Sequence, residues 1–557
     1  MAEYQIFVNG TIFTSDDDNP WAQAMIIRDG RIFWVGREES LPPCRGEVID
    51  LKGKCVIPGF VDAHMHPLML ADFRKKIAVM PPKIRSIRDL QEAVRSRRKT
   101  QGPGRWIQGW GYDEQALAEK RSPNRYDLDQ ACSDAPVCLM RSCAHIRCVN
   151  SMALALACID KDTPNPPGGE IERDESGEPT GVLKETAGNL LAPFLPAEQP
   201  GQQIDNLLEL GELLASQGIT AVCDMGNLDS PDDSIPIYEE AARRGFRQKV
   251  GLYYMWSHFA GQGDALPLLD GRMDRSRQIF AAGLKLIGDG SVSGRTAWME
   301  EPYLGPSGGR DLSGSPDLSV GYGFPVCTDD QIESAIRFCK SHGCQLSIHA
   351  MGTRAIARMV DRACRETPWT EGPVPYVRIE HVTAPSEESI RRAADHGIAF
   401  VTQPIFLYAE SASYLAGLGP ERIKTCYPVK KILENGVALG FSSDAPATFW
   451  AVPSDPLPGL KLAVTRRAAD GTDCGSCQAL DMETAVKLYT RESAKAAGFS
   501  GLGMLKEGYR ADFAVLSESI FSVSPEQADE IRVLQTYMDG ICVYNAIEKW
   551  QEDFNHV

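Results

Sequence analysis

The sequence predicts an α/β protein in which eight parallel strands close into a barrel. Short apolar runs alternate with amphipathic helical stretches through the middle of the chain, whereas both ends carry hairpin signals. Alternation of strand and helix is typical of a parallel sheet covered by helices, and eight strands favour closure into a TIM (β/α)8 barrel. An open doubly wound sheet is the structural alternative.

The two ends of the chain are predicted to build one β-sandwich. Asn9-Gly10 separates apolar runs within residues 1–57, and Asp539-Gly540 does the same within residues 501–557. An Asn-Gly or Asp-Gly pair between apolar runs is a strong hairpin signal. Because the termini of a domain commonly lie close together, the two segments are expected to pair in one sheet domain.

The predicted barrel lies within residues 58–500. Each strand candidate is a short apolar run, and a helical candidate follows most of them. The strand candidates are residues 55–64, 218–226, 249–255, 283–290, 345–350, 377–382, 398–404 and 438–446. The helical candidates are residues 204–217, 235–245, 329–343, 353–366, 386–397 and 427–436.

One connection departs from this alternation of strand and helix candidates. About 150 residues separate the first strand candidate from the second, which is too long for a simple connection. The segment contains further apolar runs and a turn-rich stretch, "TPNPPGGEIERDESGEPTG". Residues at about 75–200 are therefore predicted to form an inserted subdomain, a lid over the carboxyl ends of the strands.

Composition and charge limit the partners of this chain. Apolar residues make up 43% and charged residues 24%, as in a soluble globular protein. The net charge of −17 argues against non-specific binding to nucleic acid or to an anionic membrane surface. We find no membrane-spanning apolar run and no secretory signal, so a cytoplasmic protein is expected. A small-molecule substrate is the expected partner, and a homo-oligomer is compatible with the sequence.

Histidines gather at the predicted strand ends. His64 and His66 end the first strand candidate, and residues two apart in a strand project to the same side, so their imidazoles can bind one metal ion. His349 and His381 lie near the ends of the fifth and sixth candidates, and Asp444 near the end of the eighth. Barrel enzymes hold their active sites at this face. A single histidine there is commonly a core residue, but four together predict a divalent-metal site.

Lys285 lies inside the fourth strand candidate, among apolar residues. A buried ammonium group is costly, and burial lowers its pKa, which exposes an amine able to react with carbon dioxide. The resulting carbamate, an N6-carboxylated lysine, is an anion with two oxygens that can bridge two metal ions. An ion pair with Asp289 or another carboxylate is the alternative.

These residues lie in motifs that resemble a known superfamily. "PGFVDAHMHP", "GLKLIGDG", "IHA", "EHV" and "SSDAP", in this order, resemble the amidohydrolase superfamily. "GWGYDE", "GVLKE", "DGSVSGRTA" and "LGMLKEGYRADFAVL" resemble its long branch, which includes N-substituted formamide deformylases. The resemblance implies a TIM barrel with a β-sandwich made from both termini. It also implies that His64 and His66 hold one metal ion, with His349 and His381 around a second.

By the same resemblance, Lys285 would bridge the two ions, and Asp444 would be a ligand and the general base. Nitrogen and carboxylate ligands suit zinc, as one or two ions, and manganese, iron and nickel stay open as alternatives. Such a metal lowers the pKa of bound water to about 7. The hydroxide would attack a carbonyl, and Asp444 would pass the proton to the leaving nitrogen. The predicted activity is therefore metal-dependent hydrolysis of an amide or a related non-peptide C–N bond.

Three alternatives stay open at this point. An ester or a carbamate would be attacked by the same hydroxide. A deaminase is less favoured, because such relatives usually lack the bridging lysine and typically carry a glutamate three residues after the fifth-strand histidine, where this chain has Gly352. A non-catalytic scaffold is disfavoured because all six residues of the predicted metal site are present.

Four further residues are candidate substrate contacts. Trp110 and Trp298 could line an aromatic pocket, with ordinary packing as the alternative for each. Arg295 could meet a substrate carboxylate or form a structural salt bridge. His145 follows Cys143-Ala144, where the family often has Asp-Gly, and a core or surface position is its alternative.

Overall fold

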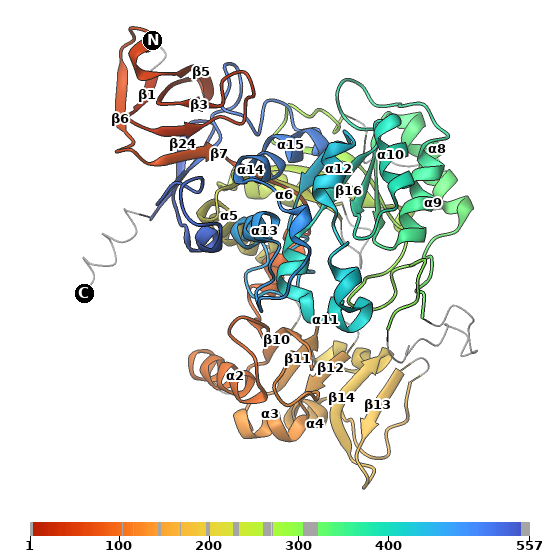
Figure 1. Cartoon of the computed structure of the whole chain (residues 1–557). Coiled ribbons are helices and arrows are strands. Elements are labelled where there is room, and N and C mark those ends of the chain that lie inside the picture. The colour runs from red at the N-terminus through yellow and green to blue at the C-terminus, as the bar shows by residue number, and fades with distance from the viewer. Residues whose placement is uncertain are drawn as a thin grey trace. The chain divides into compact units, whose positions relative to one another are not determined.

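A computed structural model describes residues 4–102, 104–114, 116–142, 146–166, 169–196, 201–226, 233–259, 269, 271–304 and 321–546. The chain divides into two compact units (Figure 1). The first consists of Met1–Pro67, Leu207–Ala445 and Ser454–Val557, and the second consists of Leu68–Asn206 and Pro446–Pro453.

The first unit is built around an eight-stranded sheet in which every neighbouring pair is parallel. Beyond the last strand, the N–H of Asp444 donates to the carbonyl of His64, and the N–H of His66 donates to the carbonyl of Ala445, both at 2.8 Å. These bonds join the two edges of the sheet, so it fits a TIM barrel. In sheet order the strands are β8 (Phe60–Met65), β15 (Ile219–Asp224), β16 (Lys249–Met255), β17 (Ile279–Ile287), β18 (Gln345–Ala350), β19 (Val377–His381), β20 (Ala399–Thr402) and β21 (Leu439–Phe441).

All eight strand candidates and all six helical candidates overlap elements of this sheet and its helices. The helices are α5 (Gln202–Ser216), α6 (Ile235–Arg243), α7 (Trp256–Phe259), α8 (Asp329–His342), α9 (Thr353–Ala363), α10 (Glu387–Asp395), α11 (Pro404–Ile423), α12 (Val429–Glu434), α13 (Pro456–Thr465), α14 (Met482–Tyr489) and α15 (Arg491–Ala497). Helix α1 (Pro67–Phe73) belongs to the second unit except for its first residue. The 3-10 helices are η1 (Glu38–Ser40), η2 (Thr186–Phe194), η3 (Ser476–Gln478) and η4 (Pro525–Glu530).

Local sequence sets the boundaries of these helices, as α8 illustrates. Thr328 accepts a hydrogen bond from the N–H of Gln331, whose side chain accepts one from the N–H of Thr328. This capping box satisfies two N–H groups that the first turn leaves unpaired. The helix ends at Gly343, whose φ of 66° is left-handed. The chain then turns directly into β18, which carries His349 near its end.

The first strand candidate, residues 55–64, is two strands in the structure. β7 (Cys55–Pro58) pairs with strands of the terminal segments, and β8 pairs with β15 in the barrel. Gly59 lies between them, where a Cβ atom would come within 2.3 Å of the Thr220 side chain. Only glycine fits this close approach, so the chain passes from one sheet to the other at this residue.

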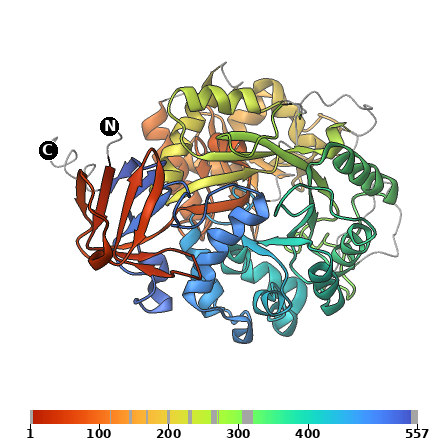
Figure 2. The same ribbon diagram turned by 90° about the horizontal axis from the view of Figure 1, so that it is seen from above.

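Strands from the two chain ends share one sheet, as Figure 2 shows in red and blue. Its order is β24 (Ile541–Asn545), β23 (Val533–Met538), β22 (Phe513–Leu516), β7, β2 (Thr11–Phe13), β3 (Trp21–Ala22). A second sheet has the order β5 (Arg31–Gly36), β4 (Ala24–Arg28), β1 (Tyr4–Val8), β6 (Gly46–Asp50). Phe7 of the second sheet contacts Phe513 of the first, with ring centroids 5.3 Å apart, inside a shared core.

A buried ion pair ties the terminal strands to the barrel. Lys249, the first residue of β16, lies 2.7 Å from an oxygen of Asp512, and both residues are 2% exposed. Asp512 also accepts a hydrogen bond from the N–H of Asp539 at 2.8 Å. Since strand β16 starts at Lys249, this contact lies at the end of the barrel opposite the predicted metal site.

The second unit has its own mixed six-stranded sheet and its own core. The sheet order is β13 (Gly169–Arg173), β14 (Pro179–Glu185), β12 (Ile146–Val149), β11 (Val137–Arg141), β10 (Ile107–Tyr112), β9 (Ile77–Ala78). Helices α2 (Ile87–Gln101), α3 (Arg125–Ala131) and α4 (Ser151–Leu156) complete it. Leu90 of α2 and Leu128 of α3 share a core cluster with Ile107 and Val137. None of the helices described in either unit has the length and apolarity of a membrane span.

Candidate metal centre

Five of the six predicted metal ligands come together at the carboxyl ends of the barrel strands. The imidazole rings form a row, with centroid distances of 5.9 Å from His66 to His64, 4.8 Å from His64 to His381 and 4.3 Å from His381 to His349. Oδ1 of Asp444 lies 3.3 Å from Nε2 of His64 and 3.4 Å from Nε2 of His66. The ligand atoms of His64, His66 and Asp444 all lie within 4.8 Å of one another.

The outer nitrogens of His64 and His66 face groups that only accept hydrogen bonds. Nδ1 of His64 lies 2.7 Å from Oε2 of Glu380, and Nδ1 of His66 lies 3.1 Å from the carbonyl oxygen of Gly226. Although burial alone would raise the pKa of Glu380, Arg378 and His64 hold it well below its usual value, so the carboxylate is ionised. These acceptors therefore hold a proton on each Nδ1, and both Nε2 atoms are directed at Asp444. Burial lowers the pKa of His66, but Asp444 more than offsets this effect and the pKa is raised.

His381 and His349 are also held through one nitrogen each. Nδ1 of His381 lies 2.9 Å from Oε1 of Gln403, and Nε2 of His349 lies 3.0 Å from the carbonyl oxygen of Gly290. Burial lowers the pKa of His349 to about 4, and burial together with the neighbouring imidazoles holds the pKa of His381 well below its usual value. Both rings are therefore neutral near pH 7, with Nε2 of His381 and Nδ1 of His349 free to donate a lone pair.

These four imidazoles and Asp444 fit a divalent cation. Burial would raise the pKa of Asp444, but His64 and His66 hold it well below its usual value, so the group is a carboxylate. Its Oδ1 is buried and has no hydrogen-bond partner among the described residues. A divalent cation bound here would replace any proton between the imidazole nitrogens and the carboxylate. Acceptors that fix the far nitrogen of each imidazole are typical of metal-binding histidines.

Lys285, the sixth predicted ligand, is an amine without a partner. It lies in β17, is 2% exposed, and its Nζ has no hydrogen-bond partner among the described residues. Burial lowers its pKa to about 8, although Glu380 and Asp444 act in the opposite direction. Asp289 instead accepts hydrogen bonds from three backbone N–H groups. The alternative ion pair between Lys285 and Asp289 is therefore not formed.

A buried ion pair next to the centre was not predicted. Arg378 and Glu380 are both 0% exposed in β19. Arg378 donates from Nε to Oε1 of Glu380 and, at 3.0 Å, from Nη2 to Oε2. Ser347 donates to the same carboxylate at 2.8 Å. The sequence contained a signal for this pair, namely charged residues inside an apolar strand candidate, as at Lys285. Because residues two apart in a strand share one face, Arg378 and Glu380 could have been expected to interact.

The backbone is strained at two of the predicted ligands. His381 has a φ of 72° and Asp444 has a φ of 55°. Non-glycine residues rarely adopt such left-handed conformations, and each costs about 1–3 kcal/mol. His381 is the last residue of β19, and Asp444 lies three residues beyond β21. The side chains of both residues lie next to His64.

The predicted substrate contacts are more scattered. Trp298 is half-buried, and its backbone N–H donates to Oδ2 of Asp289 at 2.9 Å. Arg295 donates to the carbonyl of Ala416 in α11 at 3.3 Å. Trp110 belongs to the second unit and packs on Phe73, with centroids 4.9 Å apart. His145 lies outside the described residues.

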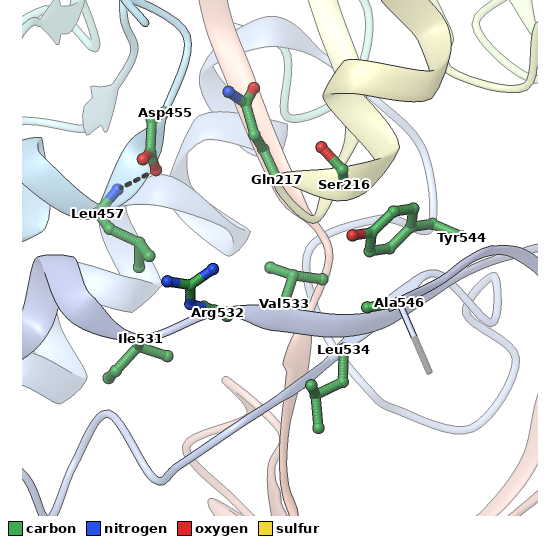
Figure 3. Close-up of a pocket in the computed structure, with 10 residues that line it drawn as sticks. All are labelled: Ser216, Gln217, Asp455, Leu457, Ile531, Arg532, Val533, Leu534, Tyr544 and Ala546. Atoms are coloured by element: carbon green, nitrogen blue, oxygen red, sulfur yellow. Dashed lines mark hydrogen bonds between the residues drawn. The ribbon is translucent and has the colours of Figure 1, made fainter. Parts of the chain in front are cut away.

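A cavity of about 240 Å³ lies away from this centre (Figure 3). It is lined by the end of α5, the start of α13 and strands β23 and β24, and includes Gln217, Asp455 and Arg532. It contains none of the ten predicted site residues. We therefore base the functional argument on the side-chain cluster at the strand ends.

Fold and site together define a class of protein. Proteins of this class have a parallel barrel-like sheet, and imidazoles and a carboxylate that fit a divalent cation lie at the carboxyl ends of its strands. The chain belongs to the amidohydrolase family, whose sequence model matches residues 47–544.

Relatives of known name and known structure match almost the whole chain. The Bacillus subtilis (strain 168) protein YtcJ is 30% identical over 550 residues, covering 97% of this chain and 99% of its own. The N-substituted formamide deformylase of Arthrobacter pascens is 29% identical over 552 residues, covering 97% and 98%. A crystal structure of an uncharacterized metal-dependent hydrolase from Pyrococcus horikoshii OT3 has a TM-score of 0.70 at 26% identity, covering 94% and 99%. These relatives agree with the superfamily and branch that the motifs indicated.

Proposed function

We propose that this protein is a metal-dependent hydrolase of an amide or a related non-peptide C–N bond, with His64, His66, Lys285, His349, His381 and Asp444 as its metal site. The observation that carries the proposal is the pairing of each imidazole with an acceptor at one nitrogen, which leaves the other nitrogen able to bind a cation. Nitrogen and carboxylate donors suit zinc, as one or two ions.

When bound, a divalent cation supplies a water that is deprotonated near neutral pH. Asp444 then has the role of general base and acid. Its Oδ1 is an ionised acceptor without a partner, so it can take the proton of the attacking water. The water oxygen bonds to the carbonyl carbon, the C–N bond breaks, and Asp444 returns the proton to the leaving nitrogen. The products are a carboxylic acid and an amine.

Lys285 is proposed to act as its carbamate. Its amine is buried, has no partner among the described residues and has a pKa lowered to about 8, so a reactive neutral fraction exists near neutral pH. Addition of carbon dioxide converts the amine into an anion and releases one proton. A negative charge at this position would balance the cations that the imidazoles bind, whereas an ammonium group would oppose them.

A small-molecule amide is the proposed substrate. Because the deformylase from Arthrobacter pascens is related over nearly its whole length, N-substituted formamides are the first compounds to test. His145, Trp110, Trp298 and Arg295 stay predicted substrate contacts, and the lid subdomain at about residues 75–200 stays a prediction.

The decisive experiment is a hydrolysis screen with zinc-loaded protein. The panel contains N-formyl, N-acyl and cyclic amides together with esters and carbamates, and Asp444→Asn serves as the blank. We expect turnover of at least one amide class that is lost on chelation and restored by zinc. Full activity after metal removal would refute the proposal, and turnover confined to esters or carbamates would replace the amide assignment.

A further inference from the structure

Asp289 is a buried carboxylate that joins two loops at the mouth of the barrel. It is 1% exposed and lies two residues beyond β17. Its Oδ2 accepts hydrogen bonds from the N–H groups of Trp298 and Gly352, both at 2.9 Å, and its Oδ1 accepts one from the N–H of Met351 at 3.0 Å. Trp298 belongs to the loop after β17, and the other two residues follow β18. One side chain therefore fixes the relative position of both loops.

The same carboxylate lies against the imidazole of His349. Nε2 of His349 is 3.0 Å from the carbonyl oxygen of Gly290 and 3.5 Å from Oδ1 of Asp289. The N–H at Nε2 thus faces two neighbouring acceptors from consecutive residues. This arrangement holds the proton on Nε2 and leaves Nδ1 as the free nitrogen of the ring.

The junction around Asp289 leaves no room for rearrangement. A Cβ atom on Gly352 would come within 2.3 Å of the Trp298 backbone, and one on Gly290 would come within 2.1 Å of the Thr296 side chain. Both glycines permit a close approach that other residues would block. Three backbone N–H groups donate to the carboxylate of Asp289, and the ring of His349 lies beside it at 3.5 Å.

We propose that Asp289 is a positioning residue of the metal centre, which acts through His349 and through the loop that carries Trp298. The inference rests on the proposed function in one respect, because it assumes that the cluster of imidazoles holds a metal. It assigns to Asp289 the orientation of the His349 ring and the contact between residues 291–299 and the end of β18.

Asp289→Asn tests this role with almost no change of shape. An amide replaces one acceptor oxygen by an NH₂ group, which faces backbone N–H donors instead of accepting from them. We expect the affinity for Co²⁺ at the His349 side of the centre to fall by about 10- to 100-fold, the usual effect of losing a partner of a metal-binding histidine. Binding at the His64, His66 and Asp444 side should change by less than about threefold.

The matched control is Asp512→Asn. Asp512 is similarly buried, at 2% exposed, and accepts a backbone N–H, but it pairs with Lys249 at the opposite end of the barrel. Both substitutions remove a buried negative charge. We expect the control to lower stability and to leave the Co²⁺ isotherm and the visible spectrum of bound Co²⁺ unchanged.

Two measurements on the full-length protein decide the question. Titration with Co²⁺, followed by its visible absorption, reports affinity, stoichiometry and ligand geometry. Hydrogen exchange of the metal-free protein reports the amides of Trp298, Met351 and Gly352. Asp289→Asn should weaken one Co²⁺ site and speed exchange of these three amides. An unchanged isotherm and spectrum would overturn the proposal, as would an equal loss of Co²⁺ binding in Asp512→Asn.

The wild-type protein provides a test even if Asp289→Asn does not fold. Slow exchange of the three amides in the metal-free protein supports the carboxylate as their acceptor, and exchange at unprotected rates overturns the proposal. Failure of the proposed function has a different signature. Wild-type protein that binds no Co²⁺ would refute the metal centre, whereas normal Co²⁺ binding with an unaffected Asp289→Asn variant would refute only the role of Asp289.

Discussion

Replacing Glu380 by glutamine, with Arg378 left in place, is expected to damage both the stability of the barrel and its metal centre. Glu380 accepts hydrogen bonds from Arg378, Ser347 and Nδ1 of His64, and it is 0% exposed. Glutamine has nearly the same shape but keeps one acceptor oxygen and has no charge. The guanidinium of Arg378, also 0% exposed, then loses the only carboxylate with which it forms an ion pair among the described residues.

The expected cost follows from the burial of both charges. Breaking a fully buried pair by removing one partner costs about 3–5 kcal/mol, because the remaining charge is left without compensation. Arg378→Met should cost a similar amount, since it leaves the carboxylate of Glu380 with only His64 and Ser347 as donors. The double variant contains neither charge. Its loss in free energy of unfolding should be smaller than the sum of the losses in the two single variants, by about 2–3 kcal/mol or more.

The zinc affinity of the metal centre should fall when Glu380 is replaced, and should not fall when Arg378 alone is replaced. Glu380→Gln weakens the acceptor of the proton on Nδ1 of His64, so the affinity for zinc should fall by about 10- to 100-fold. The same loss should persist in the double variant even though its stability recovers. This separation distinguishes a role in orienting His64 from a general role in folding.

Guanidinium unfolding curves of the four metal-free proteins measure the stability differences. Tryptophan fluorescence and circular dichroism should be followed together, because a chain with two compact units need not unfold in one step. Equilibrium dialysis against a zinc buffer measures affinity. Additive costs in the double variant would show that the two side chains do not act as a pair. Zinc affinity in Glu380→Gln equal to wild type would refute the role of Glu380 at His64.

Three other predictions concern Lys285, Asp444 and Asp455. Lys285→Ala should lower zinc occupancy. Added formate or acetate should partly restore the occupancy, because a small carboxylate can replace the proposed carbamate. Unchanged zinc stoichiometry and turnover would exclude a metal-bridging role for Lys285. Asp444→Asn should lower the rate of hydrolysis by about 10²- to 10⁴-fold with the fold retained, as expected for loss of a general base, and circular dichroism controls for the fold. Burial raises the pKa of Asp455 from 3.8 to about 6, so the folded protein binds this proton more tightly than the unfolded chain, and stability contributed by the group is lost as pH rises from about 4 to 6. Asp455→Asn keeps an acceptor for the backbone N–H of Leu457 (Figure 3). The substitution should raise the free energy of unfolding by about 1 kcal/mol at pH 7, which is only part of the full pKa shift because the residue is partly exposed. At pH 4 it should leave the free energy of unfolding unchanged. Equal gains at both pH values would contradict the assignment.

Local patterns in the sequence were sufficient to predict the barrel-like parallel sheet and the side chains that gather at the carboxyl ends of its strands. Apolar runs mark strands because each barrel strand is buried on both faces, and the helices between them carry a periodicity that needs no distant partner. Once the strands are parallel, their carboxyl ends must lie at one edge. His64, His349, His381 and Asp444 could therefore be grouped before any contact was known.

The tertiary structure alone decided how each group of the centre is held. Glu380 and His64 are separated by 316 positions, yet their contact determines which nitrogen of the imidazole is free. The same is true of the carbonyl of Gly226 at His66, 160 positions away, and of Lys285, whose lack of a partner depends on every neighbouring strand. Periodicity encodes which face of a strand is buried, but the partners across the barrel depend on how eight separate strands are aligned, and no local pattern carries that information.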